Sequence, residues 1–239
     1  MPETGQPIQS ISRRPRPEPE EMPLAIVYED DSLIAIDKPP GIVVHPTYKN
    51  WSGTLLNGVL WHVRRRGGID ASIVTRLDKD TSGLTLVALG PDVHAQVQRD
   101  GAAGLMRKEY LALVHGTPVP ARGSISLPLA RSAEDRRVVI VTPSGQDSQT
   151  DYELLSTIDG YSLVRCELIT GRTHQIRVHL AARGWPIAGD ATYGLAHPSL
   201  ARQALHAWRM TFPHPVTRAP MQIEAPVPLD LRGLMDCGI

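Results

Sequence analysis

Residues 150–169 read TDYELLSTIDGYSLVRCELI, and this stretch decides the kind of fold that we expect. Two extended segments rich in apolar side chains, residues 150–155 and 161–169, flank the pair Asp159-Gly160. An Asp-Gly pair between two such segments favours a two-residue hairpin turn. Because a hairpin joins antiparallel neighbours, the sequence predicts an antiparallel ladder here.

The rest of the chain adds more short strands and a few separate helices. We expect extended segments at residues 33–36, 42–44, 84–89, 110–114 and 138–141, each bounded by turn residues. Helices are expected at residues 54–66, with the arginines 64–66 in the last turn, at 92–99, and at 173–183 with Thr173 as N-cap. Since strands and helices do not alternate regularly, the pattern predicts an α+β fold with a mixed, mostly antiparallel sheet and flanking helices.

The ends and the composition limit the domain organisation. Residues 1–23 contain six prolines and few large apolar side chains, so we expect a disordered tail, followed by one domain over residues 24–239. Cys166 and Cys237 form no CxxC pair and no zinc-type cluster, which argues against a disulfide framework and favours a reducing, cytoplasmic location. No apolar run reaches the roughly 18 residues of a membrane helix.

The charge balance argues against a polyanionic partner. Lys and Arg number 25, as do Asp and Glu, so the formal net charge is zero, whereas nucleic-acid binders usually carry a basic surplus. The arginines are nevertheless clustered, at residues 64–66, at 136–137 and within 172–183. A neutral chain can carry a local basic surface, although each cluster by itself is equally typical of a solvated face.

Two polar segments carry the residues suited to chemistry. Residues 76–84 read RLDKDTSGL directly before an apolar run, and loops at strand ends often hold reactive groups. The same residue types also suit a plain turn capped by Asp78 or Asp80. Residues 170–180 read TGRTHQIRVHL, and on a helix His174 and Arg177 share one face. Arg177 is then free to meet a carboxylate, or it is an ordinary surface cation.

Together these segments resemble the RluA-type pseudouridine synthases. That family shows, in this order, a Lys-Pro-x-Gly turn with a following His, an Arg-Leu-Asp-x-x-Thr-Ser-Gly-Leu loop, a Lys-x-Tyr strand, a Gly-Arg-x-His-Gln-x-Arg-x-His helix and a Gly-Asp-x-x-Tyr-Gly segment. This chain matches them at residues 38–45, 76–84, 108–110, 171–179 and 189–194. Five ordered motifs over roughly residues 24–231 are more specific than any one of them alone.

The resemblance implies an isomerase that converts uridine in ribosomal or transfer RNA to pseudouridine within a central RNA-binding cleft. It implies Asp78 as the nucleophile and Arg177 as a basic partner that lowers the carboxyl pKa by about 1 to 3 units. Tyr110 either stacks on uracil or packs in the core, and Arg76 fills the space of an extruded base. The further RNA-binding or supporting residues that the resemblance implies are Lys38, His45, Leu168, Arg172 and His174.

The resemblance also sets expectations about partners and about one departure. It implies no metal and no organic cofactor, because isomerisation is redox-neutral, and we expect a monomer. Thr75 stands where the family usually shows a His before the Arg-Leu-Asp loop. This departure puts the choice of substrate in doubt more than the chemistry.

Two other functions remain open. A glycosidase could use Asp78 with Asp80 as paired carboxylates, since two residues on one extended face lie roughly 6.5 to 7 Å apart. A sequence with only 5% aromatic residues offers little of the surface that usually binds sugars. The second alternative is a non-catalytic RNA-binding module, against which the presence of Asp78, Tyr110 and Arg177 argues.

Overall fold

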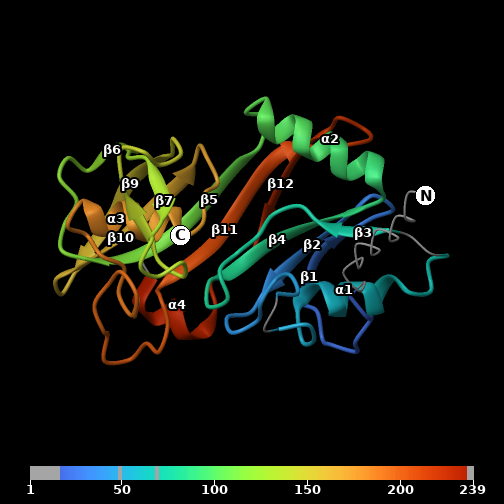
Figure 1. The fold of residues 1–239 in the computed structure, drawn as a ribbon, viewed down its shortest axis with the longest axis horizontal. Coiled ribbons are helices and arrows are strands. Elements are labelled where there is room, and N and C mark those ends of the chain that lie inside the picture. The colour runs from blue at the N-terminus through green and yellow to red at the C-terminus, as the bar shows by residue number, and fades with distance from the viewer. Residues whose placement is uncertain (1–16, 48–49, 68–69, 236–239) are drawn as a thin grey trace, which may run out of the picture.

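The computed structural model describes residues 17–47, 50–67 and 70–235, which form a long sheet with helices packed on it (Figure 1). The helices are α1 (Leu55–Val63), α2 (Pro91–Ala102), α3 (Gln175–Ala182) and α4 (Leu229–Met235). The strands are β1 (Ile26–Glu29), β2 (Leu33–Lys38), β3 (Ala71–Ile73), β4 (Ser82–Leu89), β5 (Arg107–His115), β6 (Arg122–Ser126), β7 (Leu129–Arg131), β8 (Val139–Val141), β9 (Gln149–Ile158), β10 (Tyr161–Leu168), β11 (Leu205–Pro213) and β12 (Pro220–Glu224).

The strands form a mixed, mostly antiparallel sheet, which confirms the expected α+β fold. The main order is β1-β2-β4-β11-β5-β10-β9-β6, with β12 beside β11, β3 beside β4, and β7 paired only with β8. β4 and β11 run parallel, and the other strand pairs of the described chain are antiparallel. Figure 1 shows β11 and β5 crossing the middle of the molecule between an N-terminal half and a half built around β9 and β10. The Asp78 loop and α3 therefore come from different halves.

The expected hairpin of β9 and β10 is confirmed. Its two turn residues both have positive φ, 49° at Asp159 and 81° at Gly160, as a type I′ turn requires. A second glycine position has a packing cause. Gly83, with φ 108°, lies at the start of β4, where a Cβ would approach the Ala207 carbonyl oxygen to 2.2 Å. The parallel pairing of β4 with β11 therefore requires glycine here.

Alternation along β2 explains how helices cover both faces of the N-terminal half. Ile34 and Ile36 pack with the apolar residues of α1, whereas Leu33 and Ala35 pack with Val97 of α2. Successive side chains of a strand point to opposite faces. A continuous apolar run is therefore buried on both faces of the sheet, by a different helix on each. In the other half, α3 contributes Ile176 and Leu180 to a third cluster with β5 and β10.

The first expected helix is correct in place and wrong in length. Thr54 caps α1 by accepting from the Asn57 backbone N–H, and the helix ends at Val63, before the three arginines. The expected strand at residues 42–44 does not form. Its carbonyl groups at Val43 and Val44 instead accept the Leu55 and Leu56 N–H groups, at 2.9 and 3.1 Å. These bonds satisfy donors of the first helical turn, which lack partners within the helix.

The expected start of α3 at Thr173 is also wrong. The helix begins at Gln175, and its cap residue His174 has a left-handed conformation with φ 55°. The Gln175 side chain accepts from the Arg172 backbone N–H at 2.9 Å and from the Thr170 hydroxyl at 2.8 Å. These bonds close the loop before the helix and take the place of a Thr173 cap.

Part of the expected N-terminal tail is packed on the domain. Residues 1–16 of that tail lie outside the described residues. Residues 17–23 instead make contacts with α1: the Glu18 carbonyl accepts from the Asn57 amide at 2.7 Å, and Glu20 N donates to the Asn57 carbonyl at 3.0 Å. Within the described residues, no helix has the length and apolar character needed to cross a membrane.

Candidate active site

The Asp78 loop is held from below by a buried lysine. Lys38, at the end of β2, is fully buried, and its Nζ donates to the carbonyls of Pro39 at 2.7 Å, Ile42 at 3.1 Å and Lys79 at 2.9 Å. Burial lowers the pKa of Lys38 to about 8, with nearby Asp80 opposing that shift. Lys38 thus joins its own turn to the residue after Asp78 and does not reach the cleft.

The other side of the loop is held by residues that the sequence analysis missed. Arg202 donates to the Asp80 carbonyl at 3.3 Å and is itself held by Asp230 of α4 at 2.7 Å. Gln203 donates to the Thr81 hydroxyl at 3.1 Å. No motif marks these two residues, because their role arises from contacts across 122 positions of sequence.

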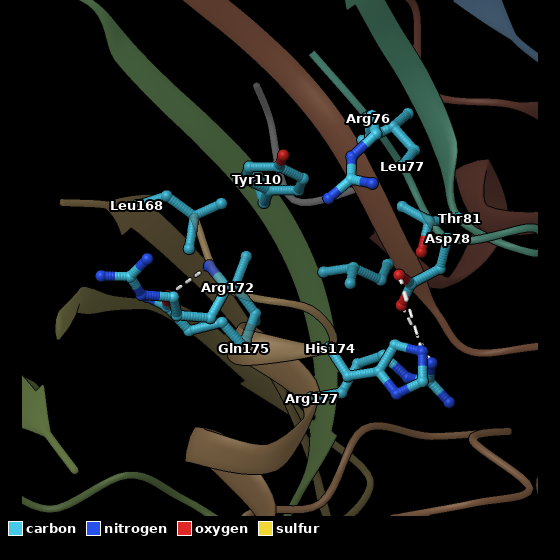
Figure 2. A pocket seen from close by; sticks show the side chains of 12 residues that line it. Arg76, Leu77, Asp78, Thr81, Tyr110, Leu168, Arg172, His174, Gln175 and Arg177 are labelled. Carbon is cyan, nitrogen blue, oxygen red and sulfur yellow. Dashed lines mark hydrogen bonds and ion pairs between the residues drawn. The ribbon is translucent and has the colours of Figure 1, made fainter. Parts of the chain in front are cut away.

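Arg177 of α3 joins two carboxylates from distant segments. Its Nη1 donates to Asp78 Oδ2 at 2.9 Å, while Nε and Nη2 donate to Asp190 at 2.6 and 2.8 Å (Figure 2 shows the Asp78 contact). Burial alone would lower the pKa of Arg177, but the two carboxylates outweigh it and raise that pKa. Asp190 is fully buried; Arg177 and two backbone N–H groups outweigh the burial and lower its pKa. The guanidinium is therefore fixed with one donor directed at Asp78.

His174 approaches the other oxygen of Asp78. Its Nε2 lies 3.8 Å from Asp78 Oδ1, and its Nδ1 is 2.8 Å from the Tyr193 hydroxyl. That hydroxyl accepts from the Val139 backbone N–H at 2.7 Å, so its own proton is available for His174 Nδ1. Burial lowers the pKa of His174, opposed by Asp78. A neutral ring with the proton on Nε2, facing the carboxylate, fits this set of contacts.

Tyr110 lies on β5 beside the carboxylate. Its side chain is buried, and burial together with the Asp78 charge raises the pKa of its hydroxyl. The hydroxyl makes no hydrogen bond to any described residue, so a bound base can use it. In Figure 2 the ring lies between Leu168 and Arg76. The raised pKa keeps the hydroxyl protonated at neutral pH in the free protein.

A cleft opens above these groups. Its inner part is lined by seven of the nine expected site residues, and it continues into a groove of about 430 Å³ that also includes His45 and Thr75. We call these two parts the Asp78 cleft. Burial and nearby Arg76 lower the pKa of His45. The seven expected residues that line the inner part are Arg76, Asp78, Tyr110, Leu168, Arg172, His174 and Arg177.

The geometry separates the two carboxylates that a paired mechanism would use. Asp80 does not line the cleft, although its backbone carbonyl helps to hold the loop. The second carboxylate near Asp78 is instead Asp190, which is fully buried and held by Arg177. Thr75 is buried at the cleft wall, where its hydroxyl accepts from the Leu86 backbone N–H at 2.8 Å.

Comparison with known proteins shows which family of proteins this chain resembles in sequence and structure. A family model described as RNA pseudouridylate synthase matches residues 32–182. Ribosomal large subunit pseudouridine synthase D of Nitrosomonas europaea is 41% identical over 226 residues, which are 90% of this chain and 65% of that protein. An uncharacterized RNA pseudouridine synthase of Bacillus subtilis is 39% identical over 91% of this chain and 73% of its own length. The solved human RNA pseudouridylate synthase domain containing 1 superposes with TM-score 0.72 at 27% identity, covering 90% of this chain and 87% of that one.

Proposed function

This chain belongs to the RNA pseudouridylate synthase family, and we propose that it isomerises uridine to pseudouridine in ribosomal RNA with Asp78 as the nucleophile. The observation that carries the proposal is the 2.9 Å contact between Arg177 Nη1 and Asp78 Oδ2 at the floor of a cleft. A carboxylate must be ionised to act as a nucleophile. The guanidinium donates a charge-assisted hydrogen bond to the carboxylate and fixes its orientation in the cleft.

The cleft residues match the steps of the reaction. The bond between ribose C1′ and uracil N1 breaks, the base turns, and C1′ bonds to C5, which loses its proton while N1 gains one. Asp78 bonds to the ribose while the base is detached. Tyr110 supplies a ring against the base and a hydroxyl next to it for the transfer of the C5 proton. Since the pKa of Tyr110 is raised, it acts as the neutral phenol rather than as a standing phenolate.

The uridine must leave the folded RNA to reach Asp78. Arg76 is exposed at the rim, where its side chain can take the place of the extruded base. His45 and Arg172 line the same groove and supply polar and cationic contacts to the strand. Lys38 and His174 act by holding the loop and the carboxylate.

The choice of ribosomal RNA follows the relatives, whose names specify the large ribosomal subunit. Transfer RNA is the other substrate class that a mapping experiment would detect. We further propose that the chain works as a monomer in the cytoplasm. In support of a monomer, Asp78, Tyr110 and Arg177, the three groups that the proposed reaction uses, line one pocket of a single chain.

The test uses ribosomal RNA labelled with tritium at uridine C5. The wild type should release tritium with the strand intact, and Asp78→Asn and Asp78→Ala should lower the rate by at least about 10⁴-fold with unchanged thermal stability. Asp80→Asn is the matched control and should stay within a few-fold of the wild type. Equal activity of the Asp78 variants would refute the nucleophile, and release of free uracil would indicate hydrolysis instead. Pseudouridine mapping of total RNA with and without the gene identifies the position.

A further inference from the structure

A second pocket of about 480 Å³ adjoins the Asp78 cleft beyond Lys108. It lies where the end of α2, the start of β5 and the end of β10 meet, elements that Figure 1 labels. We call it the flanking pocket. Its lining residues are Val74, Thr75, Val97, Gln98, Gly101, Ala102, Gly104, Met106, Arg107, Lys108, Glu167, Leu168, Ile169, Gly171 and Arg172.

The flanking pocket is continuous with the cleft. Residues on both sides of the passage, among them Thr75, Lys108 and Arg172, line both spaces. Lys108 and Tyr110 are two positions apart on β5, so their side chains leave the same face of the strand roughly 6.5 to 7 Å apart. An RNA strand that places one nucleotide against Tyr110 therefore has its neighbouring nucleotide close to Lys108.

Lys108 is a cation without a counter-ion among the described residues. The acidic residue that lines the pocket, Glu167, is already paired with Arg107 at 2.6 Å, and Glu109, next to Lys108 on β5 but outside the pocket lining, is paired with two arginines. Burial lowers the pKa of Lys108, because the loss of hydration disfavours the charged form of its amine. A phosphate at the passage would offset that loss. Because the charges of Arg107 and Glu167 offset each other, Lys108 and Arg172 give the pocket lining a net positive charge.

Thr75 is a short side chain at the wall of the passage, where it lines both spaces. Its hydroxyl accepts from the Leu86 backbone N–H of β4 at 2.8 Å, which fixes this side chain against the strand. Farther in, the wall is apolar, with Val74, Met106 and the half-exposed Ile169. Single-stranded RNA sites combine such surfaces for bases with cations for the backbone.

We propose that the flanking pocket binds an unpaired nucleotide directly adjacent to the target uridine, with its phosphate at Lys108 and its base against the apolar wall. The inference rests on the proposed function, because the target uridine defines the register of the strand. It adds a second splayed nucleotide to the substrate requirement. Specificity then depends on what stands next to the uridine as well as on the uridine itself.

The test fills the pocket without touching the charges. Gly101 lines the pocket on α2, and a Cβ there would meet no atom within 4 Å, so Gly101→Phe can enter the open space. Lys108→Gln removes the cation instead. The RNA is the ribosomal fragment found by mapping, made with an abasic ribose on the 5′ or the 3′ side of the target uridine. Binding is measured with the Asp78→Asn background and isomerisation with the active enzyme.

We expect an abasic ribose on one side, and not the other, to weaken binding by the wild type about tenfold. Gly101→Phe should weaken binding of the intact fragment by a similar factor and should show no further loss with the abasic fragment. Lys108→Gln should weaken both. Arg99→Gln, on the same helix but outside the pocket, is the control and should bind within twofold of the wild type.

The outcomes separate the two proposals. If the wild type isomerises the fragment but Gly101→Phe binds it like the wild type, or loses as much as the wild type on abasic substitution, the flanking pocket is refuted alone. If Gly101→Phe is less stable to heat, its binding is not used. The pocket is then refuted if Lys108→Gln binds like the wild type, or if the wild type loses no affinity for either abasic fragment. If no RNA is isomerised, the proposed function fails and the flanking-pocket proposal, which rests on it, fails with it.

Discussion

At the floor of the Asp78 cleft the charged side chains are paired with one another, whereas along its wall the cations have no partner among the described residues. At the floor, the Arg177 guanidinium is shared between Asp78 and Asp190, so its charge is matched inside the protein. Along the wall, Arg76, Lys108 and Arg172 have no carboxylate partner among the described residues. Many cations elsewhere are paired, as Arg122 is with Glu153 and Arg218 with Asp100. A chain of zero net charge can therefore present a locally cationic surface, because many of its carboxylates pair with cations away from this wall.

The largest expected effect comes from breaking the matched charges of the floor. Arg177→Met leaves two carboxylates, one of them fully buried, without their cation, and should lower the free energy of unfolding by about 3 to 5 kcal/mol. Isomerisation should also be lost. Urea denaturation and the tritium assay measure the two effects.

The double variant Arg177→Met with Asp190→Asn separates stability from catalysis. It removes the buried unpaired charge, so it should recover most of the stability while the activity stays lost. Recovery of activity in the double variant would contradict a direct role of Arg177 at Asp78.

The next effect concerns the lysine beneath the floor. The pKa of Lys38 is about 8 in the folded chain against 10.5 unfolded, so between these values the unfolded state binds the proton and the folded state does not. Stability from this group therefore rises as the pH rises from 8 to 10.5, by about 3 kcal/mol, and is lost again as the pH falls. The wild type should gain this amount relative to Lys38→Met across that range. Urea denaturation of both proteins at pH 7.5, 9 and 10.5 measures this. A difference in the free energy of unfolding between them that stays constant over these pH values would contradict the prediction.

A smaller effect should distinguish the unpaired cations of the wall from paired ones. Lys108→Gln and Arg172→Gln should each reduce the slope of log affinity against log salt by about 0.7, the value for one phosphate contact to a single strand. Arg122→Gln removes a cation that already has a partner in Glu153 and should leave the slope unchanged. Titrations of the target fragment at several salt concentrations measure this, and equal slopes for all three variants would show that wall and surface do not differ.

The smallest expected effect lies at His174. Tyr193→Phe removes the hydroxyl that links the Val139 N–H to His174 Nδ1 and should lower the free energy of unfolding by about 1 kcal/mol. Without that donor the ring can turn its unprotonated nitrogen toward Asp78, so kcat should fall several-fold, most strongly where His174 is neutral. A KM change alone, with kcat unchanged, would argue against this positioning role.

Local patterns predicted much of the fold. The Asp159-Gly160 hairpin, the strand after the Asp78 loop and the three main helices lie where periodicity and turn residues indicated. Errors occurred where tertiary contacts override local preference. Residues 42–44 have strand-like composition, but their carbonyls serve the first turn of α1, and the Gln175 side chain replaces the expected Thr173 cap.

The site was predicted as a set of residues rather than as an arrangement. Seven of the nine expected residues line one pocket, and Lys38 lies behind the Asp78 loop, where it donates to the Lys79 carbonyl; their roles stay predictions. The roles of Arg202 and Gln203 had no signal in the sequence, since neither belongs to a recognisable motif. Asp190 belongs to the Gly-Asp segment that the sequence analysis identified. No pattern in the neighbouring residues indicated that Arg177 binds both Asp190 and Asp78.

The sequence by itself determined the hairpin, the places of three helices and of several strands, and the residue types available for chemistry, because these depend on neighbours within a few positions. Only the tertiary structure decided which charges are matched. Arg177 and Asp78 are 99 positions apart, and they meet because α3 packs with β5 and β10 in the same apolar cluster that Leu77, next to Asp78, contacts. Pairing depends on distances of a few ångströms in the folded chain, so composition alone could not show that the unpaired cations Arg76, Lys108 and Arg172 line the cleft.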